Sequence, residues 1–311
     1  MDQDKSKKLR NLKADLDAIL KKSRKPRKAK GRPDKIRSSI VLPPKPIIYQ
    51  RDLPRLPKRG VHEMPAPYIA SLDECVEGAE LEHPEWGKTY LVTTDVNDIE
   101  GGGEIVSIFA KGLLQKHPGL KARIDPMGIP LKEGAGLEPK DLIFLDIEST
   151  GLGSSPLFLI GAMVWDQGRF EVRQYLARNY AEEKAVIALF ADLLQGRSLI
   201  VSFNGKSFDL PFIRTRGAAN GMQLDTDIPH FDLLHESRRI WKNSLPDCKL
   251  QTLEKSICGR IRHGDIPGDQ IPDAYHAYVR TNNAWQIVEI LKHNMLDLVT
   301  LADIMTHFPR E

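Results

Sequence analysis

Residues 142–151, LIFLDIESTG, decide the fold because they place two acids at the end of a short apolar run. Such a run is typical of a buried strand. Side chains two positions apart on a strand point to the same side, so the carboxylates of Asp146 and Glu148 are predicted to share one patch. The alternative is that both are solvated residues at a strand end and that the Ser-Thr-Gly after them begins a loop.

Two carboxylates in one partly buried patch repel each other, which raises at least one pKa unless a cation compensates them. Oxygen ligands with a high negative charge suit a hard divalent ion such as Mg²⁺ or Mn²⁺. The strand end therefore predicts a metal site, provided that other parts of the chain bring further ligands to it.

The surrounding sequence predicts an α/β fold. Three consecutive strands joined by tight connections are expected at 142–147, 157–165 and 169–177, and such neighbours pair antiparallel. The pattern then changes to a helix at 181–196, a buried strand at 198–203, a helix at 207–220 and a long helix at about 283–307. We expect a mixed sheet covered by helices.

Two further motifs carry acids. FNGKSFDLPFI, residues 203–213, ends a strand in Asn204-Gly205 and begins a helix whose first turn contains Asp209. An acid there is also an ordinary partner of the helix dipole. KHNMLDLVTL, residues 292–301, places His293 and Asp297 four apart on one helix face, which alone is equally consistent with a surface ion pair.

The order of the three motifs resembles the DEDD, or DnaQ-like, superfamily of metal-dependent 3′–5′ exonucleases, which have a ribonuclease H-like fold. The order is Asp-x-Glu on the first strand, Asn-x-x-x-Phe-Asp after a later strand, and His-x-x-x-Asp on a C-terminal helix. The chain looks most similar to the YprB-like subgroup, through HFDLLHESRRIW (230–241), CKLQTLE (248–254), RHGDIPGDQIP (262–272) and AYVRTNN before the last helix.

This resemblance implies that Asp146, Glu148, Asp209 and Asp297 hold two divalent ions, Mg²⁺ or Mn²⁺, and that His293 is the catalytic base. One departure bears on His293. The tyrosine branch of the superfamily has Tyr-x-x-x-Asp and the histidine branch His-x-x-x-x-Asp, whereas this chain has histidine at the tyrosine spacing.

Asn204, Phe208 and Thr150 are expected to contact the substrate. Each has a structural alternative: Asn204 as a turn residue before a glycine, Thr150 as part of the loop, and Phe208 as a packing residue beside core strands. Single-strand binders do use aromatic platforms.

Charge divides the chain. Residues 1–60 hold 20 of the 45 Lys+Arg and 6 of the 42 Asp+Glu, a net of +14, so residues 61–311 carry −11. We predict a basic, largely disordered arm with a Pro-rich linker (1–60), a small accessory subdomain (61–137) and a ribonuclease H-like exonuclease domain (138–308). The arm is suited to hold a polyanion that the acidic body repels, unless it is only a solvating tail.

The three cysteines suit neither a disulfide framework nor the paired spacing of a zinc site, and no long apolar run indicates a signal peptide or a membrane span. A cytoplasmic protein is expected. A second metal site formed by the acids and histidines between Asp227 and Asp265 has no defensible ligand spacing, and helix caps or solvated loops explain those residues more simply.

The expected function is that of a 3′–5′ exonuclease acting on DNA, single-stranded or frayed, in repair. A superfamily-2 helicase is a possible partner of the YprB-like subgroup. The alternatives are a ribonuclease with the same metal chemistry, or a binding module without turnover.

Overall fold

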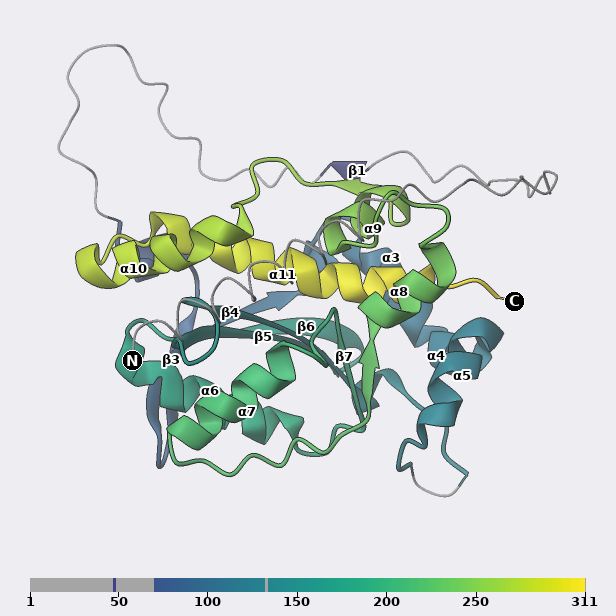
Figure 1. The fold of residues 1–311 in the computed structure, drawn as a ribbon, viewed down its shortest axis with the longest axis horizontal. Coiled ribbons are helices and arrows are strands. Elements are labelled where there is room, and N and C mark those ends of the chain that lie inside the picture. The colour runs from purple at the N-terminus through teal and green to yellow at the C-terminus, as the bar shows by residue number, and fades with distance from the viewer. Residues whose placement is uncertain (1–46, 49–69, 132–133, 311) are drawn as a thin grey trace, which may run out of the picture. The chain divides into compact units, whose positions relative to one another are not determined.

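The computed structural model describes residues 47–48, 70–131 and 134–310, which belong to one compact unit of the chain (Figure 1). The predictions made for residues 1–60 therefore lie outside the described residues, except for β1 (Ile47–Ile48), which pairs in parallel with β9 (Arg260–Ile261). No helix in the described ranges combines the length and apolar character needed to cross a bilayer.

The core of the described structure is a mixed sheet of seven strands in the order β2-β3-β6-β5-β4-β7-β8. Their bounds are β2 Ala79–His83, β3 Gly87–Asp95, β4 Leu142–Ser149, β5 Leu157–Asp166, β6 Arg169–Leu176, β7 Leu199–Ser202 and β8 His230–Asp232. Strands β4, β5 and β6 pair antiparallel, whereas β7 runs parallel to β4 and β8 parallel to β7. The predicted mixed sheet, three antiparallel strands followed by parallel ones, is confirmed.

Strands β2 and β3, within the predicted accessory subdomain of residues 61–137, continue the same sheet. Strand β3 pairs antiparallel with β6, from Tyr90 opposite Leu176 to Asp95 opposite Glu171. The helices α3 (Gly102–Ala110), α4 (Leu113–Lys116) and α5 (Pro118–Ile124) follow them. The ring of Phe109 in α3 meets the rings of Phe144 and Phe170 edge to face, at centroid distances of 6.2 and 4.9 Å. This part of the chain thus packs on the central strands through aromatic contacts.

Helices cover both faces of the sheet (Figure 1). Helices α6 (Glu183–Leu194) and α7 (Asp209–Ala219) lie on one face, and α11 (Trp285–Thr306) crosses the other. Also on the side of α11 are α8 (Leu233–Trp241), α9 (Leu250–Ser256) and α10 (Ile271–Thr281). A short helix, α2 (Leu72–Cys75), precedes β2 in the chain.

Strand β4 alternates between these two faces. Ile143 and Leu145 belong to the hydrophobic cluster that contains α6, whereas Leu142 and Phe144 pack in the cluster that contains the C-terminal half of α11. Asp146 and Glu148 continue the second series, so the pleat points both carboxylates toward the α11 side. Alternation along one strand is what positions the candidate site.

Candidate active site

Asp146 lies in the middle of the sheet, directly opposite Gly161 of β5. Burial raises the pKa of its carboxyl group well above the ordinary value, and the charges of Asp297, Glu148 and Asp209 raise it further. Asn294 of α11 opposes this effect, because its Nδ2 donates to Asp146 Oδ2 at 2.8 Å. An acid in such surroundings favours a protonated form or a nearby cation.

Glu148 stands two residues further along β4, on the same side of the strand. Burial raises its pKa from 4.5 to about 8, His293 lowers it, and the charges of Asp297 and Asp209 raise it. The charge of Glu148 also raises the pKa of Asp146, which places the two carboxylates within electrostatic reach of each other.

Asp209 is the first residue of α7 and is only 5% exposed. Burial raises its pKa to about 7, although the backbone amides of Asp209 and Ile147 lower it by hydrogen bonding. The turn before it requires a glycine, because a Cβ at Gly205 would lie 2.9 Å from Asp209 Oδ2 and 2.4 Å from Ser202 Oγ. The Asn-Gly pair thus lets the chain pass close to this carboxylate. We call Asp146, Glu148 and Asp209 the three-acid group.

His293 and Asp297 lie on one face of α11, as their spacing predicts. His293 Nε2 is 3.6 Å from Asp297 Oδ2, and its other ring nitrogen, Nδ1, is 2.9 Å from Asp265 Oδ1. Burial lowers the pKa of His293, but its hydrogen bond to the Asp265 carboxylate and the charge of Asp297 outweigh burial, so the pKa is raised above 6.5. The two carboxylates hold the imidazole between them.

Asp297 also belongs to a second buried group of charges, which we call the Arg262 cluster: Arg262, Glu254, Asp265 and Asp297. Arg262 contacts Asp297 Oδ1 at 2.6 Å, donates to Glu254 Oε2 at 2.7 Å and reaches Asp265 Oδ2 at 3.3 Å. Its side chain is 5% exposed. Burial disfavours its charge, yet the three carboxylates hold its pKa above the ordinary value.

Two side-chain amides, those of Asn294 and Gln174, form a chain of hydrogen bonds that ends on Asp146. Asn294 is fully buried, and its Oδ1 accepts a hydrogen bond from Gln174 Nε2 of β6 at 2.8 Å while its own Nδ2 donates to Asp146. A Cβ at Gly161 would lie 2.0 Å from Asn294 Oδ1, so glycine at this position lets α11 rest on the sheet. Partners of this kind orient a metal ligand and restrict its motion.

Sequence reasoning missed Arg262, Glu254, Asn294 and Gln174. It did consider Asp265, but the expectation that a cap or solvated loop explains it is wrong, because Asp265 contacts both His293 and Arg262. The available signal was the segment RHGDIPGDQIP, which contains Arg262 and Asp265 and was singled out only for its resemblance.

The predicted substrate residues lie on the loops around these acids. Asn204 adopts a left-handed backbone (φ +65°), and its backbone N–H donates to Asp232 Oδ1 at 2.8 Å. The hydroxyl of Thr150 donates to the carbonyl of Pro156 at 3.3 Å. Phe208 is 37% exposed and stacks on the buried Phe212 with ring centroids 5.7 Å apart. Asn204 and Thr150 thus have structural partners, whereas the Phe208 ring presents an accessible face.

Asp297 is close enough to raise the pKa of the other three predicted metal ligands, but the four do not converge on one point. Among the described residues, the trio of side chains whose ligand atoms all lie within 4.8 Å of one another is Cys258, Asp303 and His307. Like charges repel, and Arg262 holds one oxygen of Asp297. The donor set nevertheless fits hard divalent ions, because it consists of carboxylates, and burial and neighbouring negative charges destabilise the ionised forms of the three-acid group.

Two known proteins are similar to parts of this chain. The YprB protein of Bacillus subtilis (strain 168), itself described as uncharacterized, is 32% identical over 181 residues; these cover 57% of this chain and 44% of YprB, so the chain spans less than half of that relative. A family B DNA polymerase from the hyperthermophilic archaeon Pyrobaculum calidifontis matches 56% of this chain and 25% of its own, at 17% identity and a TM-score of 0.44.

A family model described as the RNase H superfamily matches residues 143–308, from the start of β4 to just beyond the end of α11. This range contains every residue of the three-acid group and of the Arg262 cluster, together with His293. It covers more than half of the chain. The chain belongs to the RNase H superfamily.

Proposed function

We propose that this protein is a metal-dependent 3′–5′ exonuclease that hydrolyses phosphodiester bonds of DNA at single-stranded or frayed ends. Its RNase H-like fold indicates a nuclease that acts on nucleic acid. The observation that carries the finer proposal is the three-acid group, in which burial and mutual repulsion raise the pKa of carboxylates from two separate elements. Such an arrangement is costly unless cations bind there.

Asp146, Glu148, Asp209 and Asp297 would hold two divalent ions, Mg²⁺ or Mn²⁺. Bound ions of this kind polarise the phosphate, lower the pKa of water and stabilise the charge that develops on the attacking and leaving oxygens. Asn294 would keep Asp146 in place through the hydrogen bond to its Oδ2. Asp297 would have to share its oxygens between an ion and Arg262, which now contacts Oδ1.

His293 would accept the proton of the attacking water. Its Nδ1 is bonded to Asp265 and its Nε2 points toward Asp297, so the nitrogen available for proton transfer lies on the side of the acids. An imidazole whose pKa is near or above 6.5 is suited to take up a proton near neutral pH. In this proposal His293 has the role of the histidine in the histidine branch of the superfamily, although that histidine lies five residues before its aspartate and His293 lies four before Asp297.

The basic segment 1–60, with its net charge of +14, would hold the nucleic acid near the acidic remainder of the chain. Deleting these residues should weaken DNA binding and flatten its dependence on salt. Unchanged affinity across a salt series would refute this part of the proposal. A role in DNA repair, with a superfamily-2 helicase that opens the duplex, is supported by the likeness to the YprB-like subgroup.

The proposal is tested by incubating the purified protein with 3′-labelled single-stranded DNA and RNA in Mg²⁺, in Mn²⁺ and in chelator. Asp146→Ala and the exposed, matched Asp98→Ala are assayed alongside. We expect mononucleotide release from DNA that needs metal and Asp146 but not Asp98. Release by Asp146→Ala equal to that of the unmodified protein would exclude the mechanism, preferential release from RNA would favour a ribonuclease, and binding without release would favour a non-catalytic module.

A further inference from the structure

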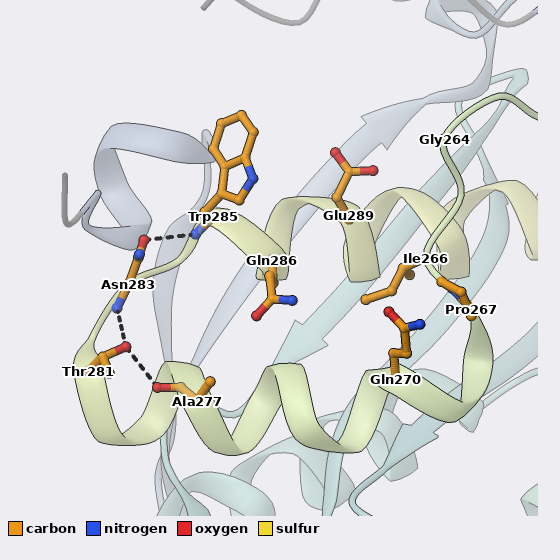
Figure 2. A pocket seen from close by; sticks show the side chains of 10 residues that line it. All are labelled: Gly264, Ile266, Pro267, Gln270, Ala277, Thr281, Asn283, Trp285, Gln286 and Glu289. Atoms are coloured by element: carbon orange, nitrogen blue, oxygen red, sulfur yellow. Dashed lines mark hydrogen bonds between the residues drawn. The ribbon is translucent and has the colours of Figure 1, made fainter. Parts of the chain in front are cut away.

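A cavity of about 590 Å³ lies between the two C-terminal helices and the loop that precedes α10 (Figure 2). It is lined by residues from the loop, from α10 (Ala277 and Thr281) and from the start of α11. The loop contributes Gly264, Ile266 and Pro267, and the start of α11 contributes Trp285, Gln286 and Glu289. In Figure 2 the amides of Gln270 and Gln286 point into the space between the helices, and the ring of Trp285 projects from the start of α11 on the side away from α10. Its volume is in the range of ordinary ligand sites.

The cavity lies next to the candidate active site, because it shares α11 and the loop around Asp265 with that site. Trp285, Glu289, His293 and Asp297 recur at intervals of four, so they form one row of neighbouring side chains that winds gradually around the helix. Gly264 and Ile266 flank Asp265, whose carboxylate contacts His293 at 2.9 Å. Eight residues of helix separate Trp285 from His293, about 12 Å, or roughly three to four nucleotides of a stacked single strand at ~3.4 Å each.

The lining has the chemistry of a site for bases rather than for phosphates. Trp285 is 44% exposed and offers an aromatic face, and Gln270, Gln286 and Asn283 offer amides that can bond the edges of bases. Glu289 can accept from exocyclic amines but repels phosphate. Asn283 is held in place, since its Oδ1 accepts from the backbone amides of Trp285 at 3.3 Å and Ala70 at 3.4 Å.

We propose that this cavity is a second binding subsite for single-stranded nucleic acid, in which Trp285 stacks on an unpaired base a few nucleotides from the end being hydrolysed. The proposal rests on the proposed function, because it takes the acids as the place where the strand end is cut. The phosphates would follow the outer rim, and the bases would enter between α10 and α11. The subsite would make the protein prefer strands long enough to reach it.

The test measures the affinity of the full-length protein for labelled single-stranded oligonucleotides of increasing length, in chelator so that no strand is cut. Trp285→Ala should weaken binding of long strands about tenfold, the order expected for one stacked base, and leave the shortest strands unaffected. Trp285→Phe should restore most of the loss. Tyr180→Ala, which removes a similarly exposed ring outside the cavity (43%), should bind like the unmodified protein.

A second variant, Gln286→Glu, guards against loss of folding in Trp285→Ala, and it should selectively weaken long strands by adding a negative charge to the cavity. Equal affinity of Trp285→Ala and the unmodified protein for long strands would overturn the proposal, as would equal weakening for strands of every length. Because these affinities are measured without turnover, absence of hydrolysis would reject the proposed function while the binding data still decide whether the subsite exists.

Discussion

Two buried groups of carboxylates meet at α11 and are treated differently by the fold. In the Arg262 cluster, a guanidinium contacts Glu254, Asp265 and Asp297. In the three-acid group, the partners that lower the pKa values are neutral donors, the Asn294 amide and two backbone N–H groups, or the partly buried His293. Both groups are removed from water, but among the residues that the structure describes a permanent positive charge, that of Arg262, contacts only the Arg262 cluster.

The difference shows in the pKa values. In the Arg262 cluster, burial raises the pKa of Asp265, but His293 and Arg262 outweigh it and the net shift is downward. The pKa of Glu254 in the same cluster is raised, because burial outweighs the opposing effect of Arg262. In the three-acid group burial dominates and every pKa rises. Arg262 stabilises the ionised forms of the acids that it contacts, whereas the ionised forms of the three-acid group stay destabilised. A bound cation would stabilise them.

The largest effect that would sharpen this comparison is the loss of Arg262. Arg262→Met leaves three buried carboxylates without their cation, so we expect the free energy of unfolding to fall by about 3–5 kcal/mol. Denaturant titration measures the change. Arg239→Met is the matched control, because its ion pair with Glu236 is largely exposed on the arginine side and should contribute only ~0–1 kcal/mol. Similar losses in both variants would mean that the cluster is not specially stabilising.

Because of the three-acid group, the free energy of unfolding should rise as the pH falls, which is the opposite of ordinary acid denaturation. The folded pKa values of Glu148, about 8, and Asp209, about 7, exceed their ordinary values of 4.5 and 3.8, so the folded state binds protons more tightly than the unfolded state. The stability that Glu148 and Asp209 contribute to the folded state is complete at a pH below their pKa values in the unfolded chain. It is lost as the pH rises through their pKa values in the folded protein. In chelator, stability should therefore increase as pH falls from about 8 to 6.5, by an amount on the order of 2–3 kcal/mol.

That prediction ends at pH 6.5, because His230 acts in the other direction. Burial lowers its pKa from 6.5 to about 4, so protonation of the unfolded chain weakens the fold below the ordinary histidine value. Glu148→Gln should flatten the rise between pH 8 and 6.5 if the three-acid group causes it. Stability that is constant over this window in the unmodified protein would contradict the raised pKa values.

Divalent ions should replace the missing counter-charge. At neutral pH, Mg²⁺ or Mn²⁺ at roughly thirty times the dissociation constant should stabilise the protein by about 2 kcal/mol, since the folded state alone holds the carboxylates together. Thermal unfolding with and without the ion measures this. Asp209→Asn should lose most of the shift, and the exposed Asp98→Asn should keep it. Equal shifts in the two variants would locate ion binding elsewhere.

The smallest effect concerns the residue that joins the two groups. Asp265→Asn weakens the bond that orients His293, so kcat should fall about tenfold with little change in KM, as is usual for a supporting partner of a metal site. Because Asp265 helps to raise the pKa of His293, its loss should move the low-pH limb of the rate profile to lower pH. Asp269→Asn, an exposed change in the same segment, is the control. A lower kcat with an unmoved profile would indicate only a structural role.

Much of the strand and helix pattern follows from local sequence. Strand β5 spans 157–166 where 157–165 was predicted, and α11 spans 285–306 where about 283–307 was predicted. Strand β5 is a continuous apolar run and α11 has a helical pattern, and the order of the acids on β4, α7 and α11 indicated the family. The predicted roles of Asp146, Glu148, Asp209, Asp297 and His293 stay predictions, although the fold brings all five into electrostatic reach of one another.

By itself, the sequence determined which residues alternate on β4, which residues share a face of α11, and that acids end a buried strand. Periodicity reports such facts because it depends on neighbours a few positions apart. Only the tertiary structure decided that Arg262 holds Asp297, that Asp265 orients His293 across 28 residues, and that Asn294 supports Asp146 across 148. These partners come from different elements, so their pairing depends on how the elements pack, and no local pattern in the chain records it.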